Sequence, residues 1–193
     1  MLQVAPDLLG RVVVHDSPEG TVAVRLTEVE AYAGPRDPGS HAYRGRTPRN
    51  GVMFGPGGFV YVYFSYGMHW CMNLVCQPEG VAAAVLLRAG RVIGGSEIAS
   101  SRRPGSSERD LARGPARLTK ALGVDGALNG CDLARGPIRV LPGVPYEDSA
   151  VATGPRVGVS ADNPLPWRFY VVDEPTVSVY RPAIKRDRAR RTR

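Results

Sequence analysis

Two carboxylates and an aromatic residue stand at alternate positions near the end of one apolar segment. Glu28, Glu30 and Tyr32 follow the segment 21–27, and alternation along a strand would put all three on its apolar face. Because a buried carboxylate must be paired or take part in chemistry, these groups are candidates to accept a proton or to stabilise a positive charge. Alternatively, the strand leaves the core here and its carboxylates are solvated or bound to arginine. The residues expected on this face are Val22, Val24, Leu26, Glu28, Glu30 and Tyr32.

A run of aromatic residues surrounds a predicted tight turn. The segments 59–65 and 68–76 are typical of paired strands, and the turn Ser65-Tyr66-Gly67-Met68 between them places Tyr66 at the tip. An aromatic side chain at a hairpin tip exposes apolar area without benefit unless it meets a partner. A wedge inserted between base pairs is one such use, whereas we expect Tyr61 to pack in the core or against the neighbouring strand.

The segment 33–58 between these two features is rich in Gly, Pro and Arg, which predicts a long loop. Loops of this length are usually functional or disordered. This one contains His41 and a local cluster of basic residues that only Asp37 opposes, and such a cluster suits a rim that faces phosphate groups. The basic residues of the cluster are Arg36, Arg44, Arg46 and Arg49.

Length and composition indicate one folded domain. The chain has 193 residues, of which 43% are hydrophobic, enough for a core and too many for wholesale disorder. The apolar run 81–87 stops at Arg88, well short of the ~18 residues that a membrane span needs, and the N-terminus lacks the basic leader of a secretion signal. We therefore expect a cytoplasmic protein with no membrane partner.

The formal net charge of +7 is unevenly distributed along the chain. Residues 181–193 carry seven basic residues against Asp187, a net of +6, which leaves +1 for the rest. We expect a domain over 1–180 and a basic, disordered tail over 181–193 that adds non-specific attraction to nucleic acid. The richness in Arg, Ala, Gly and Pro is typical of a GC-rich bacterial source.

No metal site or cofactor is predicted. The three cysteines, Cys71, Cys76 and Cys131, cannot all pair within one chain and have no metal-ligand spacing, and the three histidines are scattered. Because Cys71 and Cys76 lie in an apolar stretch, we expect buried thiols in a reducing compartment.

The order of the predicted elements indicates an α+β fold. Strands and helices do not alternate as βαβ units, so we expect a single domain on a largely antiparallel, curved sheet with short flanking helices and a protruding β-hairpin. The Gly/Ser/Arg-rich residues 94–114 predict a mobile surface loop, and Pro115 and Gly123 bound a predicted helix. The remaining predicted elements are a short helix that ends at Gly10 and strands over 11–15, 21–29, 81–87, 138–141, 156–159 and 167–172.

Taken together, these segments resemble the alkyladenine (3-methyladenine) DNA glycosylase family over about residues 8–180. Any one of the motifs alone would be weak, but their occurrence in one order is specific. The motifs are Glu28-Val29-Glu30-Ala31-Tyr32, His41, Thr47-Pro48-Arg49-Asn50, the run 61–73, Val85-Leu86-Leu87-Arg88-Ala89, Gly114-Pro115, Arg156-Val157-Gly158-Val159 and Arg168-Phe169-Tyr170-Val171.

Members of that family cleave the N-glycosidic bond of damaged purines, such as 3-methyladenine or hypoxanthine, after rotating the nucleotide out of the duplex. The resemblance implies a DNA repair hydrolase that binds double-stranded DNA containing such purines, and we expect it to act as a monomer. Matched by position, it implies that Glu30 activates water beside Arg88, that Tyr32, His41 and Tyr63 form the walls of the base pocket above Asn73, and that Tyr66 fills the vacated gap. We expect Arg44, Arg46 and Arg49 at the DNA backbone.

Stacking and hydrogen bonding give these roles a physical basis. Extruding a base costs least for a lesion that pairs badly, and the Tyr66 ring would replace the lost stacking. An electron-poor alkylated purine stacks strongly on the rings of Tyr32 and Tyr63, and the Asn73 amide could reject the exocyclic amino group of guanine. A neutral base such as hypoxanthine needs a hydrogen bond as it leaves, and the His41 region is the expected donor.

Cleavage of the DNA strand through a Schiff base would require an amine nucleophile. The chain has only two lysines, Lys120 in a predicted helix and Lys185 in the tail. We therefore predict base removal without strand cleavage.

The assignments have alternatives. Asn73 could be a satisfied strand amide, Arg88 a strand-end ion pair, and Glu28 a structural residue that orients an arginine near Glu30. For the whole chain, the alternatives are a non-catalytic nucleic-acid binding module and a carbohydrate hydrolase. The latter would use Glu28 and Glu30, roughly 7 Å apart on one strand face, as an acid and base pair.

Overall fold

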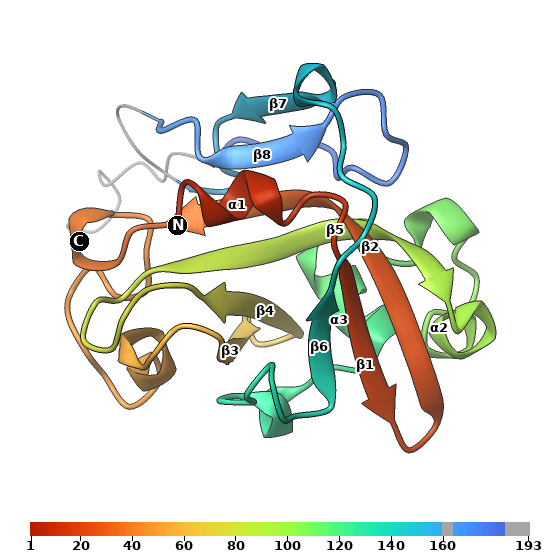
Figure 1. Cartoon of the computed structure of the whole chain (residues 1–193), viewed down its shortest axis with the longest axis horizontal. Coiled ribbons are helices and arrows are strands. Elements are labelled where there is room, and N and C mark those ends of the chain that lie inside the picture. Colours follow the sequence, from red (N-terminus) through yellow and green to blue (C-terminus); the bar gives the residue numbers. More distant parts are fainter. Residues whose placement is uncertain (160–163, 184–193) are drawn as a thin grey trace, which may run out of the picture.

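One antiparallel sheet runs through the molecule and curls around its core (Figure 1). The computed structural model describes residues 1–159 and 164–183. The strands follow the order β3-β4-β5-β2-β1-β6, and β8 pairs with both β2 and β7. The strand bounds are β1 Val12–Ser17, β2 Gly20–Tyr32, β3 Val60–Ser65, β4 His69–Val75, β5 Ala84–Gly94, β6 Ile138–Leu141, β7 Val151–Gly154 and β8 Arg168–Val171.

The strand β2 is the centre of this sheet and is paired on both sides for most of its length. On one side it pairs with β5. On the other side it pairs with β1 as far as Arg25 and with β8 from Glu28 to Glu30. Its pairing with β5 contains three register shifts, and such bulges bend a strand and increase its twist. As a result, β2 is buried on both faces from Leu26 to Ala31, so the expected apolar–polar alternation holds only in its first half.

Short helices flank the sheet. In Figure 1, α3 lies behind β5, and it packs on β4 and β5, while α1 packs on β2 and β8. As predicted, α3 begins at Pro115 and is followed by Gly123, which adopts the left-handed conformation (φ 75°) that closes a helix. The helices are α1 Val4–Asp7, α2 Ser96–Arg102 and α3 Pro115–Leu122, with single 3-10 turns η1 Gly34–Arg36, η2 Gly51–Phe54, η3 Glu108–Asp110, η4 Gly126–Leu128 and η5 Asp148–Ala150.

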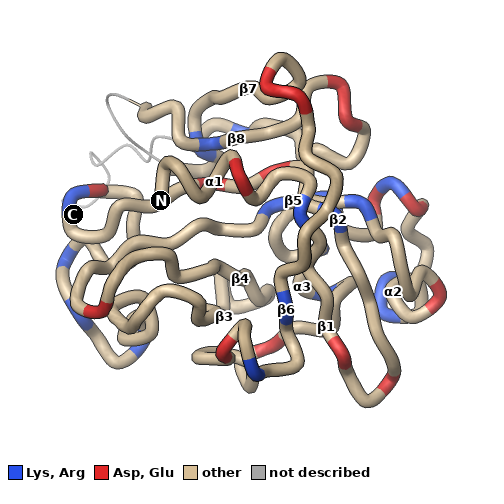
Figure 2. Tube along the Cα trace, in the orientation of Figure 1, with Lys and Arg blue, Asp and Glu red and all other residues tan. Residues whose placement is uncertain are grey.

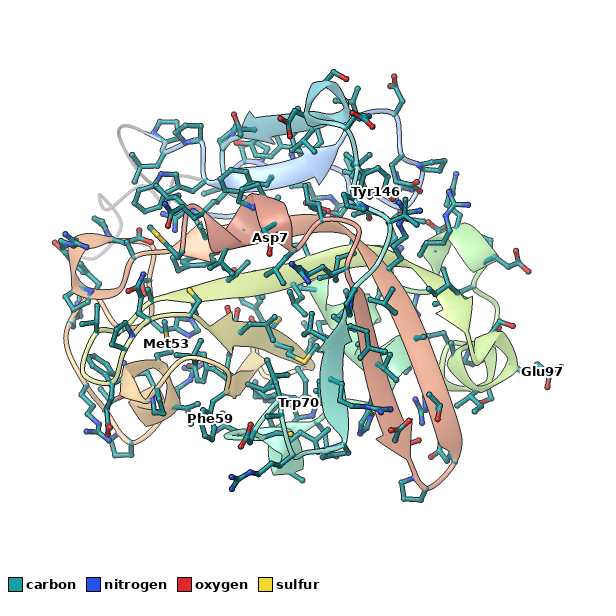
Figure 3. The ribbon with its side chains drawn as sticks, in the orientation of Figure 1. Asp7, Met53, Phe59, Trp70, Glu97 and Tyr146 are labelled. Carbon is teal, nitrogen blue, oxygen red and sulfur yellow. The ribbon has the colours of Figure 1, made fainter. Side chains whose placement is uncertain are left out.

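The long 33–58 loop is anchored by a small apolar cluster of its own. Met53 from η2 and Ala42 are buried against Tyr61, Val75 and Ala84 of the sheet, and Met53 is labelled in Figure 3. The buried Asn50 side chain adds hydrogen bonds to the carbonyls of His41 and Gly45, at 2.9 and 3.0 Å. The apolar contacts fix the loop against the sheet, and the hydrogen bonds of Asn50 hold the shape of the loop itself.

The α+β class, the antiparallel sheet and the hairpin are confirmed, but two predicted segments are wrong. Residues 94–114 are not a bare loop, because they contain α2 and η3 and bury Ala99 and Leu111. Residues 156–159 form no strand: β7 lies just before them at Val151–Gly154. Arg156 turns inward to an ion pair with Asp37 instead.

Several sequence expectations concern solubility, sulfur chemistry and the tail. Within the described ranges, no helix is both long and apolar enough to cross a bilayer. Cys71 is buried, Cys76 and Cys131 are partly buried, and all three are free thiols. From residue 184 onward the predicted tail lies outside the described residues, so its disorder and the domain boundary at 180 stay predictions.

Candidate active site

Glu28 lies in the middle of β2 with no exposed surface and is held as an ion. Its Oε1 accepts hydrogen bonds from Nε of Arg88 at 2.8 Å and from Nε of Arg168 at 2.7 Å. Ser178 donates its backbone N–H to Oε2 at 2.7 Å and its hydroxyl to Oε1 at 3.0 Å. Burial raises the pKa of Glu28, but the two arginines outweigh it and keep that pKa below its ordinary value. Glu28 is therefore a structural anion.

Glu30, two residues further along β2, is equally buried but has fewer charged partners. Its Oε1 accepts the Val157 backbone N–H at 2.7 Å and lies 3.3 Å from a terminal nitrogen of Arg88. Its Oε2 accepts the Tyr32 hydroxyl at 2.9 Å. Burial raises the pKa of Glu30 above its ordinary value, although Arg88 and the two hydrogen bonds oppose this effect. A carboxylate with a raised pKa is better suited to accept a proton.

Arg88 connects the two carboxylates. It is 5% exposed and lies inside β5, not at a strand end, with Glu28 and Glu30 as its ion-pair partners. Burial lowers the pKa of Arg88, but the two carboxylates raise it by more, so the guanidinium stays charged. The ion pair predicted for Arg88 is present. Through it Glu28 holds the arginine next to Glu30, which is the structural role considered for Glu28 in the sequence.

A narrow pocket of about 50 Å³ is lined by Tyr32, the hydrogen-bond partner of Glu30, whereas Glu30 itself is not part of the lining. Ordinary ligand pockets enclose about 300–1,000 Å³, so this one is a slot between side chains. Three larger hollows among the described residues are lined by other side chains. Tyr32 belongs to its lining and also holds Glu30, which links the carboxylate to the slot. The structure thus brings all four predicted pocket residues together. The lining residues are Tyr32, Gly39, Ser40, His41, Met53, Tyr61, Tyr63 and Asn73.

Three aromatic rings pack against one another along one side of this pocket. The rings of Tyr61 and Tyr63 are stacked with centroids 5.4 Å apart, and His41 meets Tyr63 edge-on at 4.4 Å. Nδ1 of His41 lies 3.1 Å from the Tyr61 hydroxyl. His41 is exposed as a whole, but enclosure of its ring and the nearby Arg49 charge lower the pKa of the imidazole. A neutral imidazole that accepts the Tyr61 hydroxyl at Nδ1 presents an N–H at Nε2.

Asn73 is a strand amide that also lines the pocket. It is buried in β4, and its amide nitrogen donates to the Tyr61 carbonyl at 3.3 Å, as a satisfied strand amide would. The same side chain lines the pocket. Its position within the sheet fixes where the amide faces the slot.

Tyr66 lies at the tip of the β3–β4 hairpin, as predicted, and is 87% exposed. Both central residues of the turn have positive φ, 50° at Tyr66 and 66° at Gly67, and the Met68 N–H donates to the Ser65 carbonyl at 3.1 Å. Two-residue hairpin turns favour this geometry but prefer Asn, Asp or Gly in it. A bulky residue with positive φ is strained, so both the exposure and the strain of Tyr66 oppose stability.

Basic residues of the 33–58 loop line the rim next to the hairpin. The basic positions along this loop in Figure 2 are all arginines. Arg49 donates to the Phe64 carbonyl at 2.9 Å and its guanidinium lies 5.9 Å from the centre of the Tyr63 ring, so it joins the loop to the hairpin. Arg44 and Arg46 are exposed. Asp37 does not oppose these charges at the surface, because it is buried.

Sequence reasoning assigned no role to several partners of the site. Arg168, Ser178 and the Val157 N–H contact Glu28 or Glu30 from 127–150 residues away, and the buried pair Asp37–Arg156 spans 119 residues. Arg156 and Arg168 occur in recognised motifs, but only the folded chain shows which carboxylates they meet. Among the described residues, no three of His, Cys, Asp and Glu form a group that could hold a metal ion.

Comparison with known proteins identifies the family of this chain. Residues 1–175 match the model of the family described as "Methylpurine-DNA glycosylase (MPG)". The chain belongs to this family. A protein of Streptomyces avermitilis named "Putative 3-methyladenine DNA glycosylase" is 60% identical over 94% of this chain and 87% of its own length. Relatives with the same name in Frankia casuarinae and Burkholderia cenocepacia are 52% and 48% identical, over 94% and 88% of this chain and 89% and 82% of their own lengths.

The protein is therefore a DNA glycosylase of DNA repair with bacterial relatives, as the resemblance indicated. This excludes a purely non-catalytic binding module. It also excludes a carbohydrate hydrolase with Glu28 and Glu30 as an acid and base pair. The contacts of Glu28 agree with this, because that carboxylate is bound by two arginines and a serine.

We predict that Glu28→Gln lowers the free energy of unfolding by about 3 kcal/mol near neutral pH, because it leaves Arg88 and Arg168 without their shared anion. Since the pKa of Glu28 is lowered from 4.5 in the folded state, its stabilisation is present above that value and is lost as pH falls through the folded pKa. The difference in the free energy of unfolding between wild type and variant should therefore be smaller at about pH 3 than near neutral pH. Urea unfolding at both pH values measures it.

Glu19→Gln is the matched control for this prediction. Glu19 pairs with Arg102, but its side chain is 66% exposed, so its loss should cost less than about 1 kcal/mol. Equal, small losses in the two variants would show that the Glu28 cluster does not hold the fold together.

Proposed function

We propose that the glycosylase hydrolyses the N-glycosidic bond of alkylated or deaminated purines, such as 3-methyladenine and hypoxanthine, that are flipped out of double-stranded DNA. The observation that carries the proposal is Glu30, a fully buried carboxylate of raised pKa that is hydrogen-bonded to a wall of an aromatic slot. The printed names of the relatives support 3-methyladenine as one such base. The reaction leaves an abasic site, and we expect a monomeric enzyme in the cytoplasm of a bacterium.

Glu30 acts on the attacking water. As the bond between the base and the sugar breaks, its electrons leave with the base and positive charge develops on the sugar, as in glycosidases. The Glu30 carboxylate stabilises that charge and takes a proton from the water whose oxygen bonds to the sugar carbon. Arg88 lies beside the same carboxylate oxygen as the Val157 N–H, and it positions the carboxylate and the water.

The slot selects the base by stacking and by one amide. In this proposal a flat, electron-poor ring enters between Tyr32 and the Tyr63–His41 side of the pocket, and the slot must widen to receive it. The electron-rich phenol faces favour a cation there. Asn73 rejects the exocyclic amino group that guanine carries and adenine lacks. The Nε2–H of neutral His41 supplies the hydrogen bond that a neutral base such as hypoxanthine needs as it leaves.

The hairpin and the loop hold the DNA. Tyr66 fills the gap left by the flipped nucleotide, which accounts for an aromatic ring at an exposed, strained position. Arg44, Arg46 and Arg49 contact the phosphate backbone. Lys120 is exposed on α3, and no lysine of the described residues lines the slot. Because strand cleavage through a Schiff base needs an amine at the sugar, we expect the enzyme to remove the base without cutting the strand. Lys185 lies outside the described residues.

Glu30→Gln should retain lesion binding but lower the single-turnover rate of base release by about 10³-fold, because the amide keeps the shape of the side chain and cannot take a proton. Release of 3-methyladenine or hypoxanthine from a duplex, with enzyme in excess, measures the rate. Glu97→Gln is the control, since Glu97 is exposed on α2 (Figure 3) and should give the wild-type rate. Base release by the Glu30 variant at the control rate would remove Glu30 from the mechanism.

Tyr66→Asn separates the wedge from the turn that carries it. Asn fits a positive φ, so the hairpin should stay intact, while base release from duplex DNA should fall about tenfold because no ring replaces the lost stacking. Tyr66→Phe keeps the ring and should retain the wild-type rate. Neither change should matter for a lesion in single-stranded DNA, which leaves no gap to fill. Equal duplex rates for the Asn variant and wild type would reject the wedge.

A further inference from the structure

A second buried ion pair stands directly behind the Tyr32 wall of the pocket. The Arg156 guanidinium is centred 4.5 Å from the Tyr32 ring and 5.3 Å from the Trp167 ring, and it donates to the Ala31 carbonyl at 3.0 Å. Arg156 is 5% exposed and is not part of the pocket lining. One part of the Tyr32 side chain therefore lines the slot, while the Arg156 guanidinium covers another part of its ring.

Asp37 neutralises that cation. Its two carboxylate oxygens accept hydrogen bonds from Arg156 at 2.6 and 2.7 Å, and it has no exposed surface. Burial raises the pKa of Asp37, but the guanidinium outweighs this and keeps that pKa below its ordinary value. The same carboxylate accepts the Gly39 N–H at 2.9 Å. Because Gly39 and the residues after it line the pocket, Asp37 also fixes this wall.

Gly39 allows the wall to come this close. A Cβ at this position would lie 2.9 Å from a terminal nitrogen of Arg156 and 2.6 Å from Cγ1 of Val159. The loop at Gly39 is thus packed directly against Arg156. The charges of Arg156 and Asp37 therefore lie immediately next to the residues that line the slot.

We infer that Asp37 determines specificity for charge: by cancelling Arg156 behind Tyr32, it lets the pocket accept a cationic purine. This inference rests on the proposed function. An aromatic face attracts a cation, but an uncompensated second cation behind the same ring would repel a positively charged base in a partly desolvated site. A neutral base such as hypoxanthine would not meet this repulsion. Asp37 acts through Arg156 and Tyr32, so it is a positioning residue.

The experiment compares two substrates in one enzyme preparation. Duplexes carrying 3-methyladenine, a cation, or hypoxanthine, which is neutral, are incubated with excess enzyme near neutral pH, and the single-turnover rates of base release are divided. Asp37→Asn should lower the ratio of the cationic to the neutral rate about tenfold, a change of ~1.4 kcal/mol. The double variant Asp37→Asn/Arg156→Gln, which removes both charges, should restore the wild-type ratio. Because both rates come from one preparation, partial misfolding does not move their ratio.

The opposite change keeps the inference testable if Asp37→Asn does not fold. Arg156→Gln leaves the carboxylate uncompensated and should raise the ratio. An equal loss of both rates in Asp37→Asn, or an unchanged or lowered ratio in Arg156→Gln, would overturn the inference and leave Asp37 as a structural residue. Failure of wild type to release either base would instead refute the proposed function itself.

Discussion

The site depends on one buried guanidinium that two carboxylates share. Arg88 binds Glu28 at 2.8 Å and lies 3.3 Å from Glu30, and these carboxylates stand only two residues apart on one strand. Arg168 neutralises Glu28 alone, so burial dominates at Glu30 and counter-charge dominates at Glu28. Their pKa values are therefore shifted in opposite directions. A pair of carboxylates separated in this way divides the structural role from the chemical one.

The curled sheet brings together the residues that contact Glu28 and Glu30. β1 pairs with the first half of β2, and β8 replaces it opposite Glu28 and Glu30, which brings Arg168 into register with Glu30. The contacts to Ser178 and Val157 close the cluster from the C-terminal part of the chain. Since a buried ion left without its partner is strongly destabilising, these strands and segments must be in place together for either carboxylate to be tolerated.

Local features of the sequence were predictable, and distant pairings were not. The turn at Tyr66 and the helix from Pro115 follow from local rules for turn residues and helix ends. The aromatic residues and Asn73 were assigned to one pocket through a family resemblance, and the fold brings them together. The Gly/Ser/Arg-rich composition of 94–114 gave a wrong prediction of a loop, because the segment contains α2, which packs through the buried Ala99. The inward turn of Arg156 depends on an aspartate 119 residues away, which no local pattern contains.

The most direct test is a carbon-detected NMR titration of the two carboxyl groups in the free protein. Glu28→Gln and Glu30→Gln identify the two resonances by their disappearance. Arg88 contacts both carboxylates, whereas Arg168 contacts Glu28 alone. We therefore predict a pKa above the ordinary value of 4.5 for Glu30 and a pKa below it for Glu28. Titration of both groups at or below that value, or in the reverse order, would mean that the carboxylate beside the slot is not poised to accept a proton.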